Sequence, residues 1–380
     1  IYMKILHIIP YVDPKYGGPS VVVQDMAQAS KVKGNDVHIA TTYDPFDCSS
    51  INTDESFIKA GIFIHKFKNT FPHSWFRSIP MKNWLLKNIL EFDLLHLHVP
   101  FTGPFFYGAK SALTSGKPYV VTLHGVLDPW SLQQKTWKKI PYFYLIDRNI
   151  LNQAKFLHVT SKSERDNITK LKIKTDIRLI RPCVPVINID RENVSSDEQL
   201  RILCIARLDP VKAHKVLFEA VAKLIDQGLK IVLDIAGDGG SNYKEELKSF
   251  VNKLGLDNYV FWHGHVDTEK KSILYANAWC FALISFHESF GLAAAEAMAA
   301  GLPVVVTDQV GLAEDVKAYS AGFVVETNDP HAVADAFKKL LNIKEVKACS
   351  NQALKLACEL YNRKIFTDDL NNLYLDAINS

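Results

Sequence analysis

Residues 284–308 read ISFHESFGLAAAEAMAAGLPVVVTD, and this stretch decides how the second half of the chain folds. An apolar run precedes Glu288, small residues follow Gly291, and a β-branched run follows Gly301. The order predicts a strand, a tight turn, a helix that ends at Gly301, and a second strand. Glu288 then lies in the turn above the first strand, and Glu296 lies inside the helix, about one and a half turns after Gly291.

The predicted helix in this stretch also indicates a ligand site. Its N-terminus presents the backbone N–H groups of Phe290, Gly291 and Leu292, and such an end attracts anions and polar ligand groups. A carboxylate on a buried, Ala-rich helix suits a ligand rich in hydroxyl donors, such as a sugar and a ribose. Glu288 as a simple cap and Glu296 as a surface residue form the alternative. The combination of turn, small residues and flanking strands favours the binding role.

The composition describes a globular protein of two or three domains. The chain has 380 residues, of which 48% are hydrophobic and 22% charged. No apolar run reaches the ~18–20 residues that a membrane span needs, and the beginning of the sequence lacks the layout of a signal peptide. The six cysteines form no CxxC pair. We therefore expect reduced cysteines and a cytoplasmic location.

The charge is unevenly distributed along the chain. Residues 1–180 carry 23 Lys+Arg and 14 Asp+Glu, whereas residues 181–380 carry 21 and 27. A basic first half could face nucleic acid, anionic lipid or an anionic sugar carrier. A solvated lysine-rich surface is the alternative. Because the sequence contains no nucleic-acid-binding module, we expect no nucleic acid partner.

Strand and helix patterns alternate through both halves of the chain. The first half contains MKILHIIP, VHIATT, IFIHKF, DLLHLHV, YVVTLHG and FLHVTS, and the second contains RILCIARL, IVLDIAGDG, YVFWHGHV, WCFALIS, PVVVTD and GFVVE. Helical spacing falls between them at 81–90, 102–115, 216–227, 243–254, 269–276 and 331–341, and 345–380 is also helical in pattern. This alternation predicts two doubly wound α/β domains with parallel sheets. Residues 181–199, polar and proline-containing, predict the linker between them.

Two cations follow the first strand of the second domain. Arg207 comes at the strand end in IARLDPVKAHKVL, and Lys212 is expected to open the next helix. Cations at the carboxyl end of a strand, beside a helix N-terminus, suit a diphosphate. The alternative is a pair of solvated surface cations. Residues 236–239, AGDG, form a further glycine turn at a strand end.

Glycines and a histidine follow strands of the first domain. Gly17 and Gly18 occupy the first loop, where glycine lets the backbone approach a phosphate or sugar, although a plain turn is the common explanation. His124 follows YVVTL and could donate to a sugar hydroxyl or a developing phosphate charge, whereas His96 and His98 fit structural roles. The sequence contains no DxD, Walker, HExxH or GxSxG motif.

These motifs together resemble the retaining glycosyltransferases of family 4, which have the GT-B fold. The resemblance covers nearly the whole chain: GG at 17–18, HG at 124–125, VTSKSE, RLDPVK, AGDG, WHGHV and HESFGLAAAE. It implies an α/β GT-B fold, with two doubly wound Rossmann-like domains facing each other across a cleft. The acceptor-side domain would span 1–185 and the nucleotide-sugar-binding domain 186–362, with a C-terminal helix at 363–380 that packs back on the first domain.

The resemblance also implies residue roles. Arg207 and Lys212 would hold the diphosphate, Glu296 the ribose hydroxyls, and Glu288 the O3/O4 region of the donor sugar. His124 would contact the O6 region and support the transition state. The further donor-binding positions would be Gly17, Gly18, Gly264, His265, Val266, Ser289, Phe290, Gly291 and Leu292. The family commonly has Lys-Gly where this chain has Lys212-Ala213, which could shift that loop.

The expected activity is retaining transfer of a hexose from a nucleoside-diphosphate sugar. A UDP-sugar is favoured, UDP-glucose first, and the acceptor is a glycan or lipid-linked sugar of bacterial polysaccharide biosynthesis. Two cations and a helix end stabilise the leaving diphosphate, so we expect neither a metal nor a cofactor. The alternatives are a sugar-nucleotide epimerase or phosphorylase of the same plan, or a nucleotide-sugar or polysaccharide binding protein without catalysis.

The acceptor side is marked only by composition. Residues 71–90 and 129–144 mix aromatic residues with Lys and Arg in the basic half. Such stretches suit peripheral contact with an anionic membrane or a groove for a lipid-linked sugar. Core aromatics with solvated lysines form the alternative.

Overall fold

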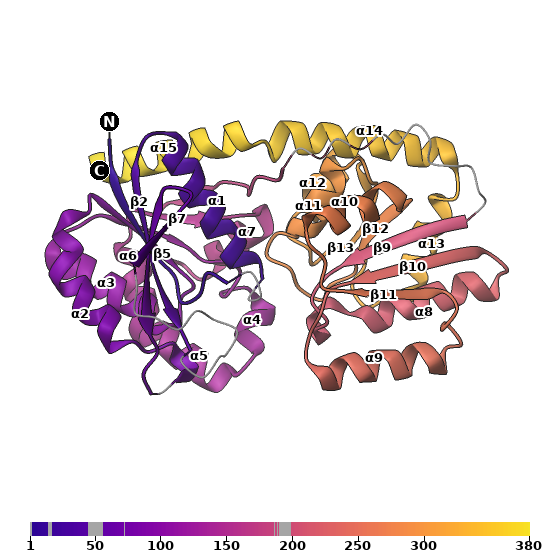
Figure 1. Ribbon diagram of the computed structural model, residues 1–380, viewed down its shortest axis with the longest axis horizontal. Helices are drawn as coiled ribbons and strands as arrows, with labels where there is room; N and C mark the ends of the chain where they lie inside the picture. Colours follow the sequence, from indigo (N-terminus) through magenta and orange to yellow (C-terminus); the bar gives the residue numbers. More distant parts are fainter. Residues whose placement is uncertain are drawn as a thin grey trace. The chain divides into compact units, whose positions relative to one another are not determined.

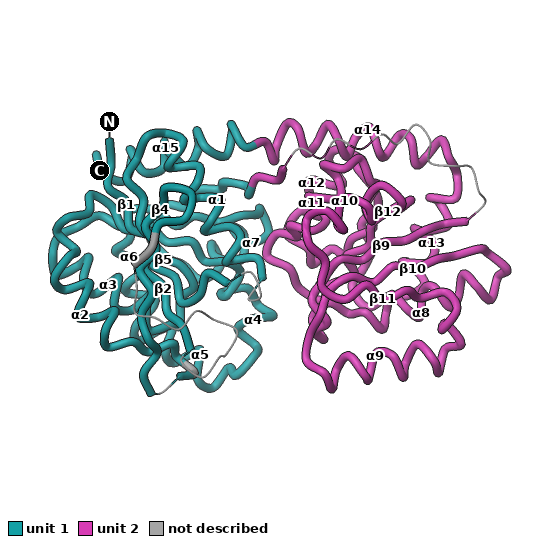
Figure 2. The backbone as a smooth tube through the Cα atoms, viewed as in Figure 1, with its two compact units in different colours: residues 1–182, 363–380 teal, residues 183–362 magenta. Residues whose placement is uncertain are grey.

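The chain folds into two units. The structure, a computed structural model, describes residues 2–13, 17–44, 56–71, 73–185, 187, 189 and 199–380. Unit 1 comprises Ile1–Pro182 together with Arg363–Ser380, and unit 2 comprises Cys183–Asn362 (Figure 2). Most of the predicted linker at 181–199 lies outside the described residues.

Unit 1 is built on an eight-stranded sheet in the order β3-β4-β2-β1-β5-β6-β7-β8. All pairings are parallel except that of the edge strand β3 with β4. The strands are β1 (Lys4–Ile8), β2 (Asp36–Tyr43), β3 (Ser56–Lys59), β4 (Ile62–Lys68), β5 (Leu94–His98), β6 (Tyr119–Thr122), β7 (Phe156–Val159) and β8 (Ile177–Leu179). The sequence patterns did not indicate β3 or β8, which are short and lie at the two edges.

The helices of unit 1 lie on both sides of this sheet (Figure 1). They are α1 (Gly18–Val32), α2 (Ile79–Asn88), α3 (Gly103–Ser115), α4 (Pro129–Gln133), α5 (Thr136–Tyr142), α6 (Arg148–Gln153), α7 (Lys162–Lys170) and α15 (Arg363–Asn379), with the short 3₁₀ helices η2 (His73–Trp75) and η3 (Ile89–Glu91) and the π-helix η4 (Phe143–Asp147). The predicted helices at 81–90 and 102–115 correspond to α2 and α3.

The C-terminal helix α15 belongs to unit 1 and packs against α1. Lys33 pairs with Asp368 at 2.6 Å, and the buried Tyr374 hydroxyl lies 2.7 Å from His96 Nδ1 of β5. Because side chains alternate along a strand, His7, His96 and His98 share the sheet face covered by α15, while Leu6, Ile8 and their equivalents face α2 and α3.

Unit 2 contains a six-stranded parallel sheet in the order β11-β10-β9-β12-β13-β14. The strands are β9 (Gln199–Ile205), β10 (Lys230–Ala236), β11 (Val260–Gly264), β12 (Cys280–Leu283), β13 (Val304–Thr307) and β14 (Gly322–Val325). The helices are α8 (His214–Asp226), α9 (Ser241–Lys253), α10 (Thr268–Asn277), α11 (Leu292–Ala299), α12 (Ala313–Tyr319), α13 (Pro330–Lys339) and α14 (Ile343–Leu360), with the short turn η5 (Pro210–Lys212).

Each face of the unit 2 sheet has its own core. Alternate residues of β9 and β12, such as Leu203 and Phe281, pack with α11, α12 and α14, whereas Ile202 and Cys280 pack with α8, α9 and α13. A sheet covered on both faces requires strands that are apolar throughout, which is the pattern of these sequences. The predicted architecture of two doubly wound α/β domains is confirmed, and the predicted helices of this half lie within two residues of those observed.

The cysteines of the described residues are all free. Cys183, Cys204, Cys280 and Cys349 are buried, and Cys358 is exposed. Cys48 lies outside the described residues. None of the helices in the described part of the chain is both long enough and apolar enough to cross a membrane.

Candidate active site

The loop after β12 is held in place by the loop after β13. The Glu288 amide donates to the Gln309 carbonyl at 3.1 Å, and the Gly311 amide donates to the Glu288 carbonyl at 2.8 Å. Gly291 has φ +105°, and a Cβ there would lie 2.8 Å from Val310 Cγ1. Glycine is therefore required at this position, and α11 begins directly after it, as predicted.

Three predicted amides lie free at the start of α11. Among the residues that the structure describes, the N–H groups of Phe290, Gly291 and Leu292 form no recorded hydrogen bond with a backbone carbonyl. The first N–H groups of a helix have no partner inside the helix and carry partial positive charge. The loop thus presents donors near the Glu288 carboxylate, which is itself only partly exposed.

Lys212 and Glu288 form an ion pair between Nζ and Oε2. Both side chains are mostly buried, with exposed fractions of 13% and 22%. Their loops are joined by a hydrogen bond from the Phe286 amide to the Val211 carbonyl, 2.8 Å long. Two residues predicted separately from distant motifs therefore meet at the carboxyl ends of the neighbouring strands β9 and β12.

The turn that carries Lys212 differs from the prediction. Lys212 does not open a helix: it ends the short turn η5, whose first amide is capped by Asp209, and α8 begins two residues later. Between them Ala213 takes the left-handed conformation, with φ +48° and ψ +37°. The alanine therefore preserves the backbone shape that glycine would adopt, and the loop holds Lys212 against Glu288 despite the substitution.

Arg207 lies on a second loop that is fixed by glycines. Arg207 is exposed and forms no ion pair with a described residue. Its neighbour Leu208 donates an amide hydrogen bond to the Asp238 carbonyl at 2.9 Å. The Gly237 amide in turn donates to the Gly264 carbonyl at 2.7 Å. The loop after β10, at Gly237–Asp238, therefore connects the Arg207 loop on one side with the predicted nucleobase loop Gly264–Val266 on the other.

Glu296 contacts two residues that the sequence reasoning missed. Lys271 Nζ donates to Glu296 Oε2 at 2.7 Å, and the Tyr275 hydroxyl donates to the same oxygen at 3.1 Å. Burial, together with the Glu296 charge, raises the pKa of Tyr275 well above its usual value, so this hydroxyl stays protonated as a donor. Lys271 and Tyr275 are four residues apart on α10 and share one face of the helix; that spacing was the available signal.

In unit 1, the residues predicted to contact the donor lie on two loops, which follow strands β1 and β6. Gly17, with φ +91°, precedes α1, and Gly18 is its first residue, with open space where a Cβ would be. His124 follows β6 and also has a positive φ of +56°. Burial, with a smaller contribution from the charge of His158, lowers the pKa of His124 to about 3. The side chain is therefore neutral near pH 7 and can donate a hydrogen bond without carrying charge.

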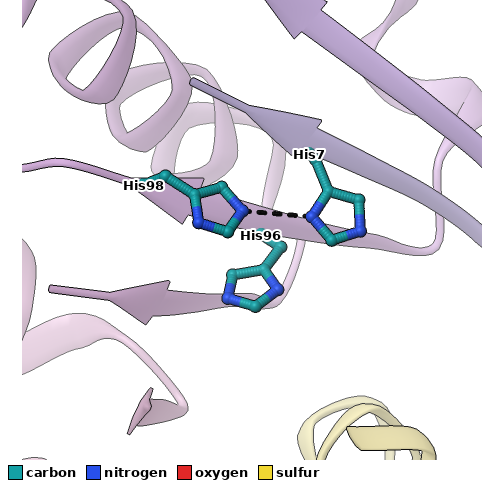
Figure 3. Close-up of side chains that lie close together, drawn as sticks. All are labelled: His7, His96 and His98. Carbon is teal, nitrogen blue, oxygen red and sulfur yellow. Dashed lines mark hydrogen bonds between the residues drawn. The ribbon is translucent and has the colours of Figure 1, made fainter. Parts of the chain in front are cut away.

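A row of buried histidines leads to His124, and Figure 3 shows three of them, His7, His96 and His98. His124 Nε2 lies 3.0 Å from His98 Nδ1, and His98 Nε2 lies 3.0 Å from His7 Nδ1. His96 is bonded through both ring nitrogens, to Tyr374 and to Thr122. His96 and His98 are thus part of a network of buried side chains, whereas the structural role expected for them was a bond to the backbone.

Three of these histidines are close enough to suggest a metal. The ring nitrogens of His7, His96 and His98 lie within 4.8 Å of one another, and among the described residues only this group meets that criterion. However, both nitrogens of His96 are already hydrogen-bonded, and in the part of the chain that the structure describes no carboxylate or thiolate joins the group. We interpret the cluster as a hydrogen-bonded network.

The comparisons with known proteins agree with this geometry. Residues 16–186 match the sequence model described as Glycosyltransferase Family 4, and residues 186–355 match that of Glycosyl transferases group 1. The chain is 26% identical over 372 residues to an uncharacterized glycosyltransferase of Methanocaldococcus jannaschii, covering 90% of this chain and 89% of that protein.

Two further relatives extend the comparison. A D-inositol 3-phosphate glycosyltransferase of Corynebacterium jeikeium is 29% identical over 273 residues, which span 66% of this chain and 64% of the relative. The structure of HepE from Anabaena, solved in complex with UDP and glucose, superimposes with a TM-score of 0.77 at 19% identity, covering 98% of this chain and 99% of HepE. The chain is therefore a glycosyltransferase with the GT-B fold, in which a family 4 domain is followed by a group 1 domain.

Proposed function

We propose that the protein transfers a hexose, with retention of configuration, from a UDP-sugar to a glycan or lipid-linked sugar of a bacterial polysaccharide. UDP-glucose is our first choice of donor, because HepE shares the fold and binds UDP and glucose. The observation that carries the proposal is the Lys212–Glu288 pair, which places a cation and a hydroxyl acceptor together at the carboxyl ends of β9 and β12. Ligands bind at that edge in doubly wound sheets.

The proposed reaction divides charge between the two products. The bond from the anomeric carbon to the diphosphate oxygen breaks, and the acceptor oxygen bonds to the same carbon from the same face. The acceptor proton passes to the leaving diphosphate. Positive charge develops on the sugar and negative charge on UDP, and Arg207, Lys212 and the start of α11 stabilise the latter. The chain's own cations suffice for this, so we propose that neither a metal nor a cofactor takes part.

Donor binding changes the partners of the unit 2 carboxylates. Lys212 gains an anionic phosphate partner, which leaves Glu288 to accept hydrogen bonds from the sugar hydroxyls. Glu296 remains oriented by Lys271 and Tyr275 and accepts from the ribose hydroxyls. His124, neutral, donates to the sugar's O6 region from unit 1. Gly17, Gly18 and Gly264–Val266 complete the proposed donor contacts.

A donor panel tests the proposal directly. Purified protein is incubated with UDP-glucose, UDP-galactose, UDP-GlcNAc and GDP-mannose, and nucleoside diphosphate release is measured with and without acceptor extract. We expect acceptor-dependent UDP release, and only slow hydrolysis without acceptor. Rapid release without acceptor would instead favour an epimerase of the hydrolysing type.

Variants test the two cations. Arg207→Ala and Lys212→Ala should each lower transfer by about 10²–10³-fold, the cost of removing a preorganised donor from the developing charge. Lys253→Ala removes an exposed cation from the end of α9 and is the matched control. Near-normal turnover of either site variant, with the control also normal, would refute the diphosphate role.

The basic aromatic segment at 129–144 supports peripheral membrane contact as part of the proposal. Trp137 is 75% exposed and Tyr144 56%, and the following Leu145 is 79% exposed. Lys138 Nζ lies 4.6 Å from the Trp137 ring centroid, so a cation accompanies the apolar surface. Such a combination binds anionic interfaces. The test is co-sedimentation with anionic and neutral vesicles, in which Trp137→Ser should weaken the salt-sensitive binding and binding to neither vesicle would refute the contact.

A further inference from the structure

Glu164 is a buried carboxylate for which the proposed reaction has no role. It lies in the first turn of α7 and is only 1% exposed. Its Oε2 accepts from the Thr160 amide at 2.8 Å and from the Thr160 hydroxyl at 3.0 Å, one residue before the N-cap Ser161. Its Oε1 accepts from the Gly125 amide at 2.7 Å, on the loop after β6. The first pair of bonds is local to the start of α7, whereas the bond to Gly125 reaches a different loop.

The Gly125 bond holds an unusual turn. His124 and Gly125 both have positive φ values, +56° and +73°. A residue with a Cβ, such as His124, adopts this conformation at a cost and keeps it only when the surroundings impose it. The Glu164 carboxylate supplies that constraint through the amide that directly follows His124. On the other side, the His124 ring is held at 3.0 Å by His98.

The ionised carboxylate suits this arrangement. Two of the three groups that approach Glu164 are amides, which only donate, and the Thr160 hydroxyl also donates to it, whereas an ionised carboxylate offers only acceptors. Burial and, after it, the charge of Asp128 raise the pKa of Glu164 to about 7, while its three donors oppose the shift. Asp128 faces Glu164 from the start of α4; on α7 itself, Lys162 is partly exposed and Arg165 is exposed.

We propose that Glu164 is a positioning residue for glycosyl transfer, which fixes the direction of the His124 side chain by holding the Gly125 amide. The proposal rests on the role of His124 in the proposed function. It assigns no contact with substrate to Glu164. Loss of the Gly125 bond lets the turn relax to negative φ and moves the imidazole away from the donor sugar. The nucleotide contacts in unit 2 stay unchanged.

The test compares Glu164→Gln with Thr160→Val. The glutamine places an N–H₂ group against one of the donors, whereas the valine removes only the Thr160 hydroxyl and is the matched control. We expect Glu164→Gln to lower kcat for UDP-glucose turnover by about 10²-fold, the scale of a 1 Å misplacement, with KM and the Kd for UDP changed by less than about twofold. Thr160→Val should retain kcat close to that of the wild type.

Two readouts do not depend on turnover. Hydrogen exchange of the Gly125 amide should accelerate in Glu164→Gln and stay slow in Thr160→Val. The His124 ring resonances of the wild type should also change as the pH falls through about 7, although His124 itself stays neutral there. If UDP-glucose is not turned over, the proposed donor fails and these two measurements still decide the role of Glu164.

The outcomes separate positioning of the Gly125 amide from the local contact of Glu164 with Thr160. The proposal would be overturned if both variants lost kcat equally. It would also be overturned if Glu164→Gln kept both the kcat and the protection of the Gly125 amide that the wild type shows. If Glu164→Gln does not fold, the wild-type pH profile decides: kcat should fall as the pH falls from about 8 to about 6, because protonation removes an acceptor. A kcat that is constant over that range would then overturn it.

Discussion

Replacing Gly237 with alanine tests how tightly the Arg207 loop is built. Gly237 has φ +135°, and a Cβ there would lie 1.9 Å from the Ala206 carbonyl oxygen. Both the conformation and the contact exclude a side chain, because a carbon and a backbone oxygen cannot approach that closely. Relief requires the loops after β9 and β10 to separate, and Arg207 lies on the first of them.

The size of the effect follows from the backbone strain at residue 237 and from the separation of the two loops. An alanine in a sparsely populated region of φ and ψ costs about 1–3 kcal/mol. Separating the loops also strains the hydrogen bonds from Gly237 to Gly264 and from Leu208 to Asp238, at about 1 kcal/mol each. We expect Gly237→Ala to destabilise unit 2 by about 3–5 kcal/mol. For a unit of this size, the melting temperature should fall by roughly 10 °C.

The same loop offers two controls. At Gly239 a Cβ would meet the Leu208 carbonyl oxygen at 2.1 Å without a positive φ, so Gly239→Ala measures the contact alone. At Gly240 nothing lies within 4 Å, and φ is −58°. Gly240→Ala should therefore change stability by less than about 1 kcal/mol, because the lost N-cap preference and the reduced entropy of the unfolded chain oppose each other.

The assays are urea unfolding and UDP titration. Gly237→Ala should lower the urea midpoint and weaken UDP binding by about tenfold or more, because Arg207 loses a charge-assisted hydrogen bond worth about 1.5–3 kcal/mol. Gly240→Ala should do neither. If Gly237→Ala unfolds at the same urea concentration as the wild type, the loop is not close-packed and the reasoning is wrong.

Three further predictions concern single contacts and pH. Ala213→Gly should stabilise unit 2 by up to about 1 kcal/mol in urea unfolding, because glycine adopts φ +48° without strain, and a loss of stability would contradict this explanation. Tyr275→Phe leaves Lys271 alone to orient Glu296 and should weaken UDP binding by about 5–10-fold in calorimetry, with an unchanged Kd arguing against the ribose role. Acid should destabilise unit 1 before unit 2. Burial lowers the pKa values of His7 and His124 to about 3 and of His65 and His158 to about 4 in unit 1, and it lowers that of His214 to about 4 in unit 2. Between about pH 6.5 and pH 4 the unfolded chain binds protons that the folded unit 1 does not, so stability falls as the pH falls, by up to about 1.4 kcal/mol per pH unit for each histidine. Asp147 and Glu164, raised to about 7, take up protons more readily when folded and oppose this effect, but they are outnumbered. Hydrogen exchange that shows unit 2 opening first at pH 5 would contradict the prediction.

Local patterns in the sequence were enough to predict the two α/β units and part of the site. Parallel strands that are buried on both faces appear in the sequence as apolar runs, and the helices between them appear as segments whose apolar residues recur with a period of 3.6. Glu288 and Glu296 could be placed on a turn and a helix because Gly291 and the small residues around it are local signals. The differences between prediction and structure are equally local. Lys212 ends the short turn η5 because Ala213 adopts a left-handed conformation, which an alanine in the sequence does not predict.

The partners of these residues were decided only by the tertiary structure. Lys212 and Glu288 are 76 residues apart, Glu164 and Gly125 are 39 apart, and His96 and Tyr374 are 278 apart. Helical spacing shows that Lys271 and Tyr275 share a face, but it does not show that this face meets Glu296. The sequence by itself determined which segments form strands and helices and which loops lie at strand ends, because those properties depend on neighbouring residues. The order of the strands determined which loops meet, and strand order depends on how whole helices and sheet faces bury their apolar surfaces together.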